Sequence, residues 1–273
     1  MDAMDIMLPN GTIVANGTTF RNTFHTQIFK FVDHVDIFVP CGGRPNSITL
    51  NNLHYFVDEK TGKCKIPYIV EGANLFITQP AKNALEEHGC ILFKDASANK
   101  GGVTSSSMEV LASLALNDND FVHKFIGDVS GERSALYKSY VVEVQSRIQK
   151  NAELEFGQLW NLNQLNGTHI SEISNQLSFT INKLNDDLVA SQELWLNDLK
   201  LRNYLLLDKI IPKILIDVAG PQSVLENIPE SYLKVLLSSY LSSTFVYQNG
   251  IDVNIGKFLE FIGGLKREAE ASA

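Results

Sequence analysis

Three short apolar runs, each followed directly by a loop rich in glycine, asparagine or serine, constrain the fold of this chain most strongly. The runs are Val35–Val39, Pro67–Val70 and Cys90–Phe93. Their length and the turn-forming residues after them are typical of buried strands. A helix-like stretch, Gln79–His88, lies between the second and third runs and has Pro80 near its first turn. This order predicts parallel strands joined by a right-handed crossover.

The pattern becomes helical from Gly101 onward. Apolar residues recur three, four or seven positions apart at Ile173, Leu177, Ile181, Leu184, Leu188 and Trp195. This spacing predicts one face of a long helix that ends before Pro212. Pro229 stands at a predicted first helical position and is followed by a second apolar series. We therefore predict an α/β part over residues 1–117 and a helical domain over residues 118–273.

Composition and charge exclude several classes of protein. Of the 273 residues, 44% are hydrophobic and 20% are charged, which is enough apolar material for a buried core. A formal net charge of -8 would repel a phosphate backbone, so we expect no nucleic-acid partner. We also expect no membrane partner, because no apolar run approaches the roughly 20 residues that cross a bilayer.

Cysteine and histidine spacing argues against disulfides and metal sites. Cys41, Cys64 and Cys90 are far apart and lack the spacing of a disulfide framework or a zinc ribbon. The six histidines show no ligand spacing either, so no metal is predicted. A reducing, intracellular setting, cytoplasmic or mitochondrial, fits this composition best.

The loops after the three predicted strands are the place to look for a ligand, because ligands of open parallel sheets bind beyond the carboxyl ends of the strands. The loops span residues 40–46, 71–74 and 94–102. Each also has a structural interpretation: glycines that turn the chain, Asn74 as a helix cap, and Ser105–Ser107 as ordinary first-turn residues. Three such loops at one edge of a sheet favour a ligand site.

Three motifs in these loops carry a family resemblance. They are FVPCGGRPNSI, KIPYIVEGANLFITQPA and CILFKDASANKGGVTSSSMEVLASLAL. In this order and spacing they resemble the cofactor-domain motifs of the large, fungal-type NAD-specific glutamate dehydrogenases, over about residues 35–116. The resemblance implies an α/β fold: the carboxyl-terminal part of a Rossmann-like doubly wound parallel sheet, followed by a mainly helical domain.

The resemblance also implies contacts with NAD, position by position. The loop at Cys41 and Gly42 is similar to the one that lies against the ribose and nicotinamide in the wider family. Asn74 matches the asparagine that contacts the nicotinamide ribose, and Asn99 matches the one near the nicotinamide carboxamide. These four residues are therefore the expected cofactor-binding positions.

Val103 and Ser106 match the pair that lines the pocket for the substrate side chain. A serine suits a dicarboxylic amino acid, because a buried carboxylate needs hydrogen bonds to offset its desolvation. The implied activity is oxidative deamination of L-glutamate to 2-oxoglutarate and ammonia, in a full-length enzyme that is a homo-oligomer.

The chain departs from the family in two respects. It lacks a G-x-G-x-x-G turn after a strand, and it lacks the family's catalytic Lys and Asp, so no catalytic residue is assigned. Lys94 and Lys100 match neither position and are predicted to be solvated charges. Two alternatives stay open: an inactive fragment that acts as an interaction or oligomerisation module, and a protein that binds a nucleotide for regulation.

Overall fold

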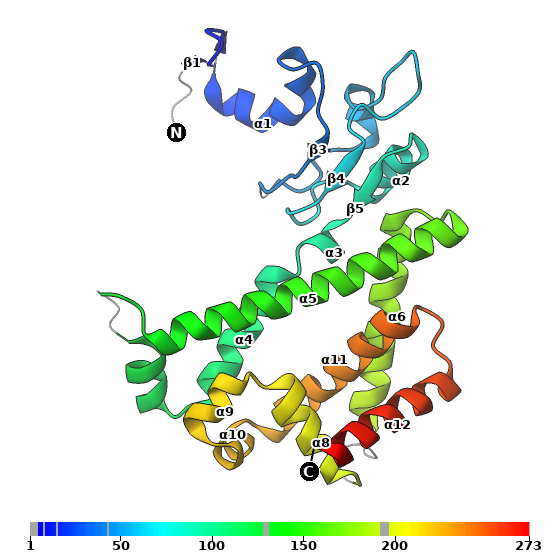
Figure 1. Cartoon of the computed structure of the whole chain (residues 1–273). Coiled ribbons are helices and arrows are strands. Elements are labelled where there is room, and N and C mark those ends of the chain that lie inside the picture. Colours follow the sequence, from blue (N-terminus) through cyan, green and yellow to red (C-terminus); the bar gives the residue numbers. More distant parts are fainter. Residues whose placement is uncertain are drawn as a thin grey trace. The chain divides into compact units, whose positions relative to one another are not determined.

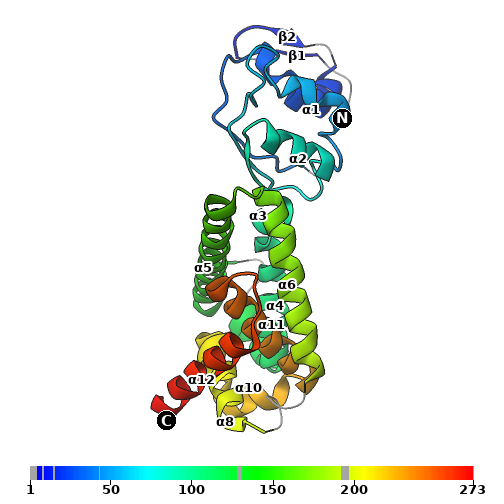
Figure 2. The same ribbon diagram turned by 90° about the vertical axis from the view of Figure 1, so that its right-hand side faces the viewer.

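The computed structural model divides the chain into two compact units. It describes residues 5–7, 9–14, 16–42, 44–127, 131–191 and 197–272. The first unit comprises Met1–Asn99 and His169–Ser171; the second comprises Lys100–Thr168 and Glu172–Ala273. Figures 1 and 2 show the elements of both units in two views.

The first unit contains the predicted parallel sheet. Its elements are β1 (Ile6–Met7), β2 (Ile13–Val14), α1 (Gly17–Gln27), η1 (Ile28–Lys30), β3 (Ile37–Phe38), η2 (Leu50–Tyr55), β4 (Tyr68–Val70), α2 (Gln79–Glu87), β5 (Ile91–Phe93) and α3 (Asp95–Ala98). The sheet order is β3-β4-β5 and both pairings are parallel. β1 and β2 form a separate antiparallel pair. The three predicted strands and their parallel pairing are confirmed, and the fold is α/β with a partial Rossmann-like sheet. The prediction that the first strand is buried is wrong, because Ile37 and Val39 are exposed.

Helix α2 covers this sheet with a short amphipathic face. Pro80 lies in its first turn, where a missing backbone N–H costs nothing, as predicted. Ala81 and Leu85, four residues apart, are fully buried and join the core of the unit. That core consists of Ile48, Phe56, Ile66, Ile69, Ala73, Phe76, Ile77, Ala81, Leu85, Cys90 and Leu92. The helix ends at Glu87, and Gly89 then takes the left-handed conformation.

The regular secondary structure among the described residues of the second unit is all helical. Its elements are α4 (Gly101–Ala115), the π-helical turn η3 (Asp120–Ile126), α5 (Ala135–Asn166), α6 (Ile170–Ala190, from Glu172 on), α8 (Leu199–Tyr204), the π-helical turn η4 (Leu205–Ile210), α9 (Lys213–Ala219), α10 (Pro221–Asn227), α11 (Glu230–Asn249) and α12 (Ile255–Ala271). Across the described part of the chain, no helix combines the length and the apolar character needed to span a bilayer.

One core joins most of these helices. Tyr140 on α5 is buried and donates a hydrogen bond of 2.6 Å to the Met108 carbonyl on α4. Its ring meets Phe125 edge to face with centroids 5.0 Å apart, and Tyr137 meets the same phenylalanine at 5.5 Å. The α5 helix begins at a Ser134 side-chain cap and ends at Gly167, which has a positive φ of 70°.

The long helix predicted from the apolar series that begins at Ile173, and expected to end before Pro212, is present as α6 and ends at Ala190. Two further elements, α8 and η4, lie between it and Pro212. Trp195, a member of the predicted face, lies outside the described residues. Leu205 and Leu206, in η4, are buried in the core of the second unit. The segment after α6 thus buries apolar residues of its own in this core. Helical periodicity alone does not distinguish such a separate segment from a continuation of α6.

The predicted domain boundary after residue 117 stays a prediction. By compactness, α4 belongs to the second unit, because the division falls between Asn99 and Lys100. Of the three loops that carry the family resemblance, those at residues 40–46 and 71–74 belong to the first unit. The third loop, residues 94–102, is divided between the two units, and the start of α4 belongs to the second.

Candidate functional site

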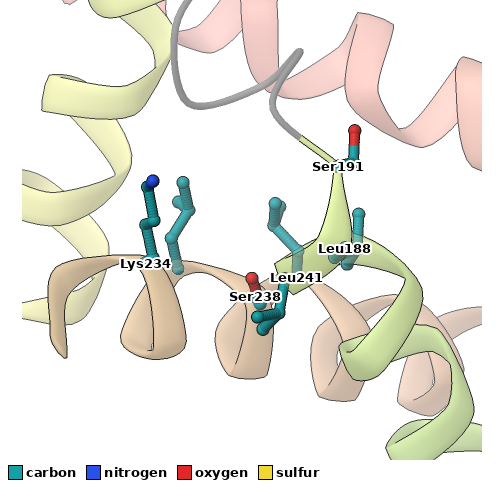
Figure 3. A pocket seen from close by; sticks show the side chains of 7 residues that line it. Leu188, Ser191, Lys234, Ser238 and Leu241 are labelled. Atoms are coloured by element: carbon teal, nitrogen blue, oxygen red, sulfur yellow. The ribbon is translucent and has the colours of Figure 1, made fainter. Parts of the chain in front are cut away.

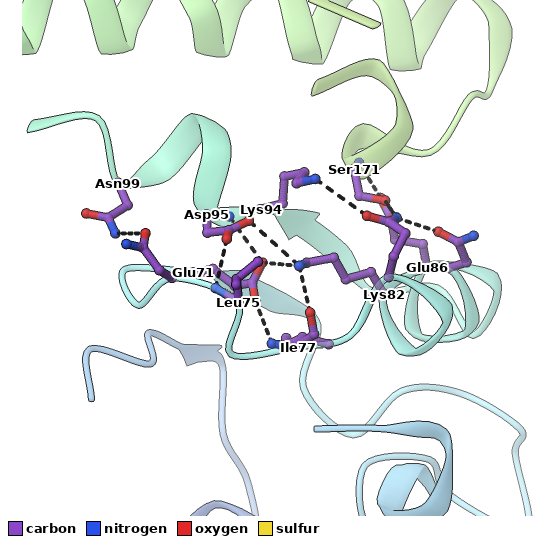
Figure 4. Close-up of polar contacts among 12 residues, drawn as sticks. Glu71, Leu75, Ile77, Lys82, Glu86, Lys94, Asp95, Asn99 and Ser171 are labelled. Carbon is purple, nitrogen blue, oxygen red and sulfur yellow. Dashed lines mark hydrogen bonds and ion pairs between the residues drawn. The ribbon is translucent and has the colours of Figure 1, made fainter. Parts of the chain in front are cut away.

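Two of the four predicted cofactor-binding side chains contact each other in the first unit. Asn74 lies in the loop after β4, and Asn99 follows α3. The Asn99 side-chain amide donates a hydrogen bond of 2.6 Å to the Asn74 side-chain carbonyl (Figure 4). Asn74 is exposed and Asn99 is partly buried. The remaining amide donors of exposed Asn74 can therefore meet a polar ligand. Asn74 is not the N-cap residue of α2, because Thr78 occupies that position.

The loop after β3 is in close contact with the loop after β4. The Asn46 N–H donates to the Leu75 carbonyl at 2.8 Å, and both residues have positive φ angles, 57° and 55°. Leu75 is strained there, because a side chain with a Cβ rarely takes the left-handed conformation. A residue held in strain beside exposed Asn74 fits a loop whose shape serves a ligand.

Gly72 is the point of closest approach between these loops. A Cβ placed on it would lie 2.9 Å from the Cys41 Sγ and 3.2 Å from the Pro40 carbonyl. Gly42 has ordinary space for a Cβ, with the Arg44 guanidinium 3.7 Å away, and Gly43 lies outside the described residues. Cys41 is exposed. The glycine at position 72 therefore permits the contact, whereas Gly42 is not sterically required by its own surroundings.

Gly72→Ala is expected to destabilise the first unit by roughly 1–3 kcal/mol, because the added methyl group overpacks a contact made by backbone. Urea unfolding followed by circular dichroism measures this difference. Gly42→Ala, in the neighbouring loop, is the matched control and should change the free energy of unfolding far less. Equal effects of the two substitutions would show that the contact between Gly72 and Cys41 is absent.

A buried charge network lies beneath the Asn74 loop. The Lys82 Nζ, on α2, is 2.9 Å from a carboxylate oxygen of Glu71 and 3.7 Å from one of Asp95. It also donates a hydrogen bond of 2.8 Å to the Ile77 carbonyl. The Lys82 side chain is 3% exposed and that of Glu71 is fully buried (Figure 4). A lysine this buried is retained only where its charge is paired and its protons are bonded.

The two carboxylates of this network hold the backbone that follows Asn74. Glu71 accepts hydrogen bonds from the Ile77 N–H at 2.9 Å and from the Asp95 N–H at 3.1 Å. Asp95 accepts from the Leu75 N–H at 2.8 Å. Burial alone would raise the pKa of Asp95, but the Leu75 bond and the Lys82 charge outweigh burial and hold that pKa below its ordinary value. The network thus fixes the loop that presents Asn74.

A second buried carboxylate, Glu86, lies at the other end of α2. It accepts hydrogen bonds from the backbone N–H and from the hydroxyl of Ser171, which belongs to the same unit (Figure 4). Burial raises the pKa of Glu86, although the bonds from Ser171 act in the opposite direction. The carboxyl therefore keeps its proton to a higher pH in the folded chain than in the unfolded chain.

Replacing Glu86 by glutamine should make stability depend less on pH. A raised folded-state pKa contributes stability that is complete below the unfolded pKa and is lost as pH rises through the folded pKa. Glu86→Gln cannot ionise, so its free energy of unfolding relative to the parent chain should rise as the pH increases above the ordinary pKa of a glutamate. Denaturant titrations at several pH values measure this difference. Exposed Glu87→Gln is the control, and an identical pH profile for both variants would contradict the assignment.

Val103 and Ser106 both lie near the start of α4, in the second unit. The Ser106 hydroxyl donates a hydrogen bond of 3.0 Å to the Val103 carbonyl. Val103 is 71% exposed and Ser106 is exposed as well. Rotation about one side-chain bond is enough to turn this hydroxyl from the helix backbone towards a ligand. The two predicted substrate residues are thus brought together on one exposed turn.

The prediction that Lys94 and Lys100 are solvated charges holds only in part, since both are partly buried although 42% of the Lys100 side chain is exposed. Lys100 forms an ion pair with Glu155 on α5, whose side chain is 4% exposed, and that same Glu155 oxygen accepts a 2.7 Å bond from the Tyr247 hydroxyl. Burial lowers the pKa of Lys94, and the Lys82 charge lowers it further. Both lysines are thus partly desolvated. Lys100 pairs with a carboxylate that is distant in sequence, and the local sequence pattern does not predict this pair.

Sequence reasoning also missed the network of Glu71, Lys82 and Asp95. One signal was present: Lys82 directly follows Ala81 and precedes Leu85 by three positions, which places a charge on the buried face of α2. A lysine on such a face signals a buried partner, but it does not identify which carboxylates supply it.

A pocket in the second unit is too small for a substrate. It lies between α6 and α11 and has about 10 Å³ of space for water (Figure 3). Such a volume holds about one water molecule. Its lining includes Leu188, Ser191, Lys234, Ser238 and Leu241. No group of three His, Cys, Asp or Glu side chains suited to a metal ion occurs among the described residues.

The two asparagines lie beyond the carboxyl ends of parallel strands, which is where open α/β sheets bind their ligands. The model of the Glutamate/Leucine/Phenylalanine/Valine dehydrogenase family matches residues 8–167. The chain belongs to this family. No solved structure matches the chain.

Curated relatives narrow the comparison. The chain is 49% identical over 261 residues to the NAD-specific glutamate dehydrogenase of Neurospora crassa, covering 96% of this chain and 24% of that protein. It is 46% identical to the probable NAD-specific glutamate dehydrogenase of Schizosaccharomyces pombe, with 94% of the chain and 22% of the relative covered. It is 44% identical to glutamate dehydrogenase 2 of Dictyostelium discoideum, with 97% of the chain and 25% of the relative covered. The chain thus spans about a quarter of the length of these relatives.

Proposed function

We propose that this chain is the carboxyl-terminal portion of an NAD-dependent glutamate dehydrogenase and that it binds the nicotinamide end of the cofactor. One observation carries the proposal: Asn74 and Asn99 meet beyond the carboxyl ends of β4 and β5, above a buried charge network that fixes their loop. Two relatives named NAD-specific glutamate dehydrogenases support the same cofactor.

The residues in this part of the first unit fit the nicotinamide end of NAD. Asn74 and Asn99 offer amide donors and carbonyl acceptors to the ribose hydroxyls and to the carboxamide. Gly42, beside exposed Cys41, has no side chain of its own and so permits a flat ring to approach the backbone closely. When bound, NAD supplies the acceptor for the hydride that leaves the amino acid. The chain's own residues hold and orient that end of the cofactor.

Val103 and Ser106 are proposed to receive the side chain of L-glutamate. The Ser106 hydroxyl, now bonded to the Val103 carbonyl, would donate instead to the distal carboxylate, and the amino-terminal dipole of α4 favours the same charge. The reaction yields 2-oxoglutarate and ammonia. We assign no acid or base to this chain, and we propose that the remaining part of a longer polypeptide supplies it, together with the pyrophosphate-binding turn.

A hybrid enzyme tests this proposal. The matching segment of the Neurospora crassa relative, which covers 24% of that protein, is replaced by this chain, and NADH formation from glutamate and NAD is followed by absorbance. We expect glutamate-dependent turnover by the hybrid and none by the isolated chain. A hybrid that folds and assembles like the parent enzyme but forms no NADH would contradict the proposal.

The alternative of a non-catalytic interaction module makes the opposite prediction for the hybrid enzyme. The absence of a pyrophosphate turn and of an assigned base in this chain favours it for the chain in isolation. Under that alternative, sustained reduction of NAD by the purified chain never occurs, and the hybrid is inactive as well. Turnover by the hybrid therefore separates the two functions.

A further inference from the structure

Two cysteines that are far apart in sequence meet in the first unit. The Cys64 N–H donates to the His88 carbonyl at 2.8 Å, and the Ile91 N–H donates to the Pro67 carbonyl at 2.8 Å. These two backbone bonds bracket Cys64 and Cys90 on neighbouring segments that lead into β4 and β5. Cys64 packs against the apolar core that contains Cys90, and each thiol affects the pKa of the other. The sequence spacing had given no reason to pair them.

The two thiols differ in their access to solvent. Cys90 is 5% exposed and packs in the core of the first unit, whereas Cys64 is only partly buried. Cys64 also lines an open pocket of about 410 Å³ on the surface of this unit. The other lining residues are Phe29, Val32, Asp33, Asp58, Thr61, Lys63 and Lys65. A small uncharged solute can therefore reach Cys64, past groups of both charge signs.

The contact between the thiols also makes their acidities unequal. The Cys90 thiol lowers the pKa of Cys64 and outweighs the effect of burial. The Cys64 thiol and burial raise the pKa of Cys90, and the nearby Glu86 carboxylate adds to this. Cys64 is thus the thiol that ionises first, and a thiolate is the nucleophilic form of cysteine.

We propose that Cys64 and Cys90 form an oxidation site that a peroxide converts to an intrachain disulfide, with Cys64 as the attacking thiol and Cys90 as the resolving thiol. The Cys64 sulfur attacks one oxygen of hydrogen peroxide, the O–O bond breaks, and Cys64 becomes a sulfenic acid with release of water. The Cys90 sulfur then attacks the Cys64 sulfur, the S–O bond breaks, and a second water leaves. Both thiols are oxidised to one disulfide, and the peroxide is reduced to two waters.

This disulfide would close a loop that contains Asn74, one of the four candidate cofactor-binding residues, and two members of the charge network. Residues 65–89 lie between the two cysteines and include Glu71, Asn74 and Lys82. Closing such a loop restricts the unfolded chain and stabilises the folded one. The oxidation site rests on contacts within the first unit and needs no NAD, so it stands apart from the proposed function.

Peptide mapping of the native chain tests the proposal. The purified chain is treated with hydrogen peroxide, the remaining thiols are alkylated, and the chain is digested with trypsin without reduction. We expect the number of free thiols to fall from three to one. Residues 64–65 should be recovered joined to residues 83–94, and dithiothreitol should separate them. Recovery of Cys64 as a sulfinic acid with Cys90 alkylated, or of a linkage to Cys41, would overturn the proposal.

Two variants supply the controls. Cys41→Ser removes the exposed cysteine beside Gly72 and should form the same linkage at the same rate. Cys64→Ser should leave Cys90 reduced at a peroxide dose that fully oxidises the parent chain, with circular dichroism confirming that the variant is folded. Oxidation of Cys90 at an unchanged rate in Cys64→Ser would exclude Cys64 as the attacking thiol. The map of the parent chain is decisive even if this variant does not fold.

Discussion

Lys82→Met is expected to lower the free energy of unfolding of the first unit by roughly 3–5 kcal/mol. The substitution keeps the length and apolar stem of the side chain but removes the ammonium group that pairs with the carboxylates of Glu71 and Asp95. It also removes the donor to the Ile77 carbonyl. Glu71 is fully buried, so its carboxylate would lose the counter-charge 2.9 Å away in surroundings that solvate a charge poorly.

Urea unfolding at neutral pH measures this loss. Lys60→Met is the matched control, because Lys60 is an exposed lysine in the same unit and its loss should cost little. Because the network bonds the backbone around Asn74, Lys82→Met should also speed amide exchange at Leu75 and Ile77. A loss of stability no larger than that of Lys60→Met would mean that Lys82 is not buried against the two carboxylates.

Ser106→Ala should lower kcat/KM for glutamate by roughly 10–100-fold in the hybrid enzyme, because a hydrogen bond to a charged carboxylate contributes about 1.5–3 kcal/mol. The KM for NAD should change little, since Asn74 and Asn99, not Ser106, are proposed to hold the cofactor. Initial rates over a matrix of glutamate and NAD concentrations separate the two effects.

The neighbouring serine provides the control for this substitution. Ser105 is also exposed, and its hydroxyl donates to the Gly102 carbonyl much as that of Ser106 donates to Val103. One residue along a helix turns the side chain to another direction, so Ser105→Ala should leave kcat/KM nearly unchanged. Equal losses in both variants would argue for a general effect on α4, and no loss in either would remove Ser106 from the glutamate pocket.

The strands of the parallel sheet, though not β1 and β2, were predictable because short apolar runs ended by turn residues have few other interpretations. Ile69 and Leu92 are fully buried, as the runs imply, and the loops after them carry the asparagines that meet. The roles of Asn74, Asn99, Val103 and Ser106 came from the resemblance and stay predictions. Their mutual contacts within each unit are what the structure adds.

The buried charges and the helix ends were not predictable, for a shared physical reason. Lys82 and Lys100 pair with carboxylates that the fold brings near them, up to 55 residues away in the case of Glu155. Likewise, the end of α6 at Ala190 is accompanied by burial of Leu205 and Leu206 in the core of the second unit. Such effects depend on tertiary packing, which local patterns do not encode.

The central claim is that this chain binds the nicotinamide end of NAD, and saturation-transfer NMR of NAD with the purified chain tests it most directly. We predict that the nicotinamide protons receive more saturation than the adenine protons and that Asn74→Ala, folded by circular dichroism, loses this difference. Larger saturation of the adenine protons, or a pattern that is the same in Asn74→Ala, would contradict the account.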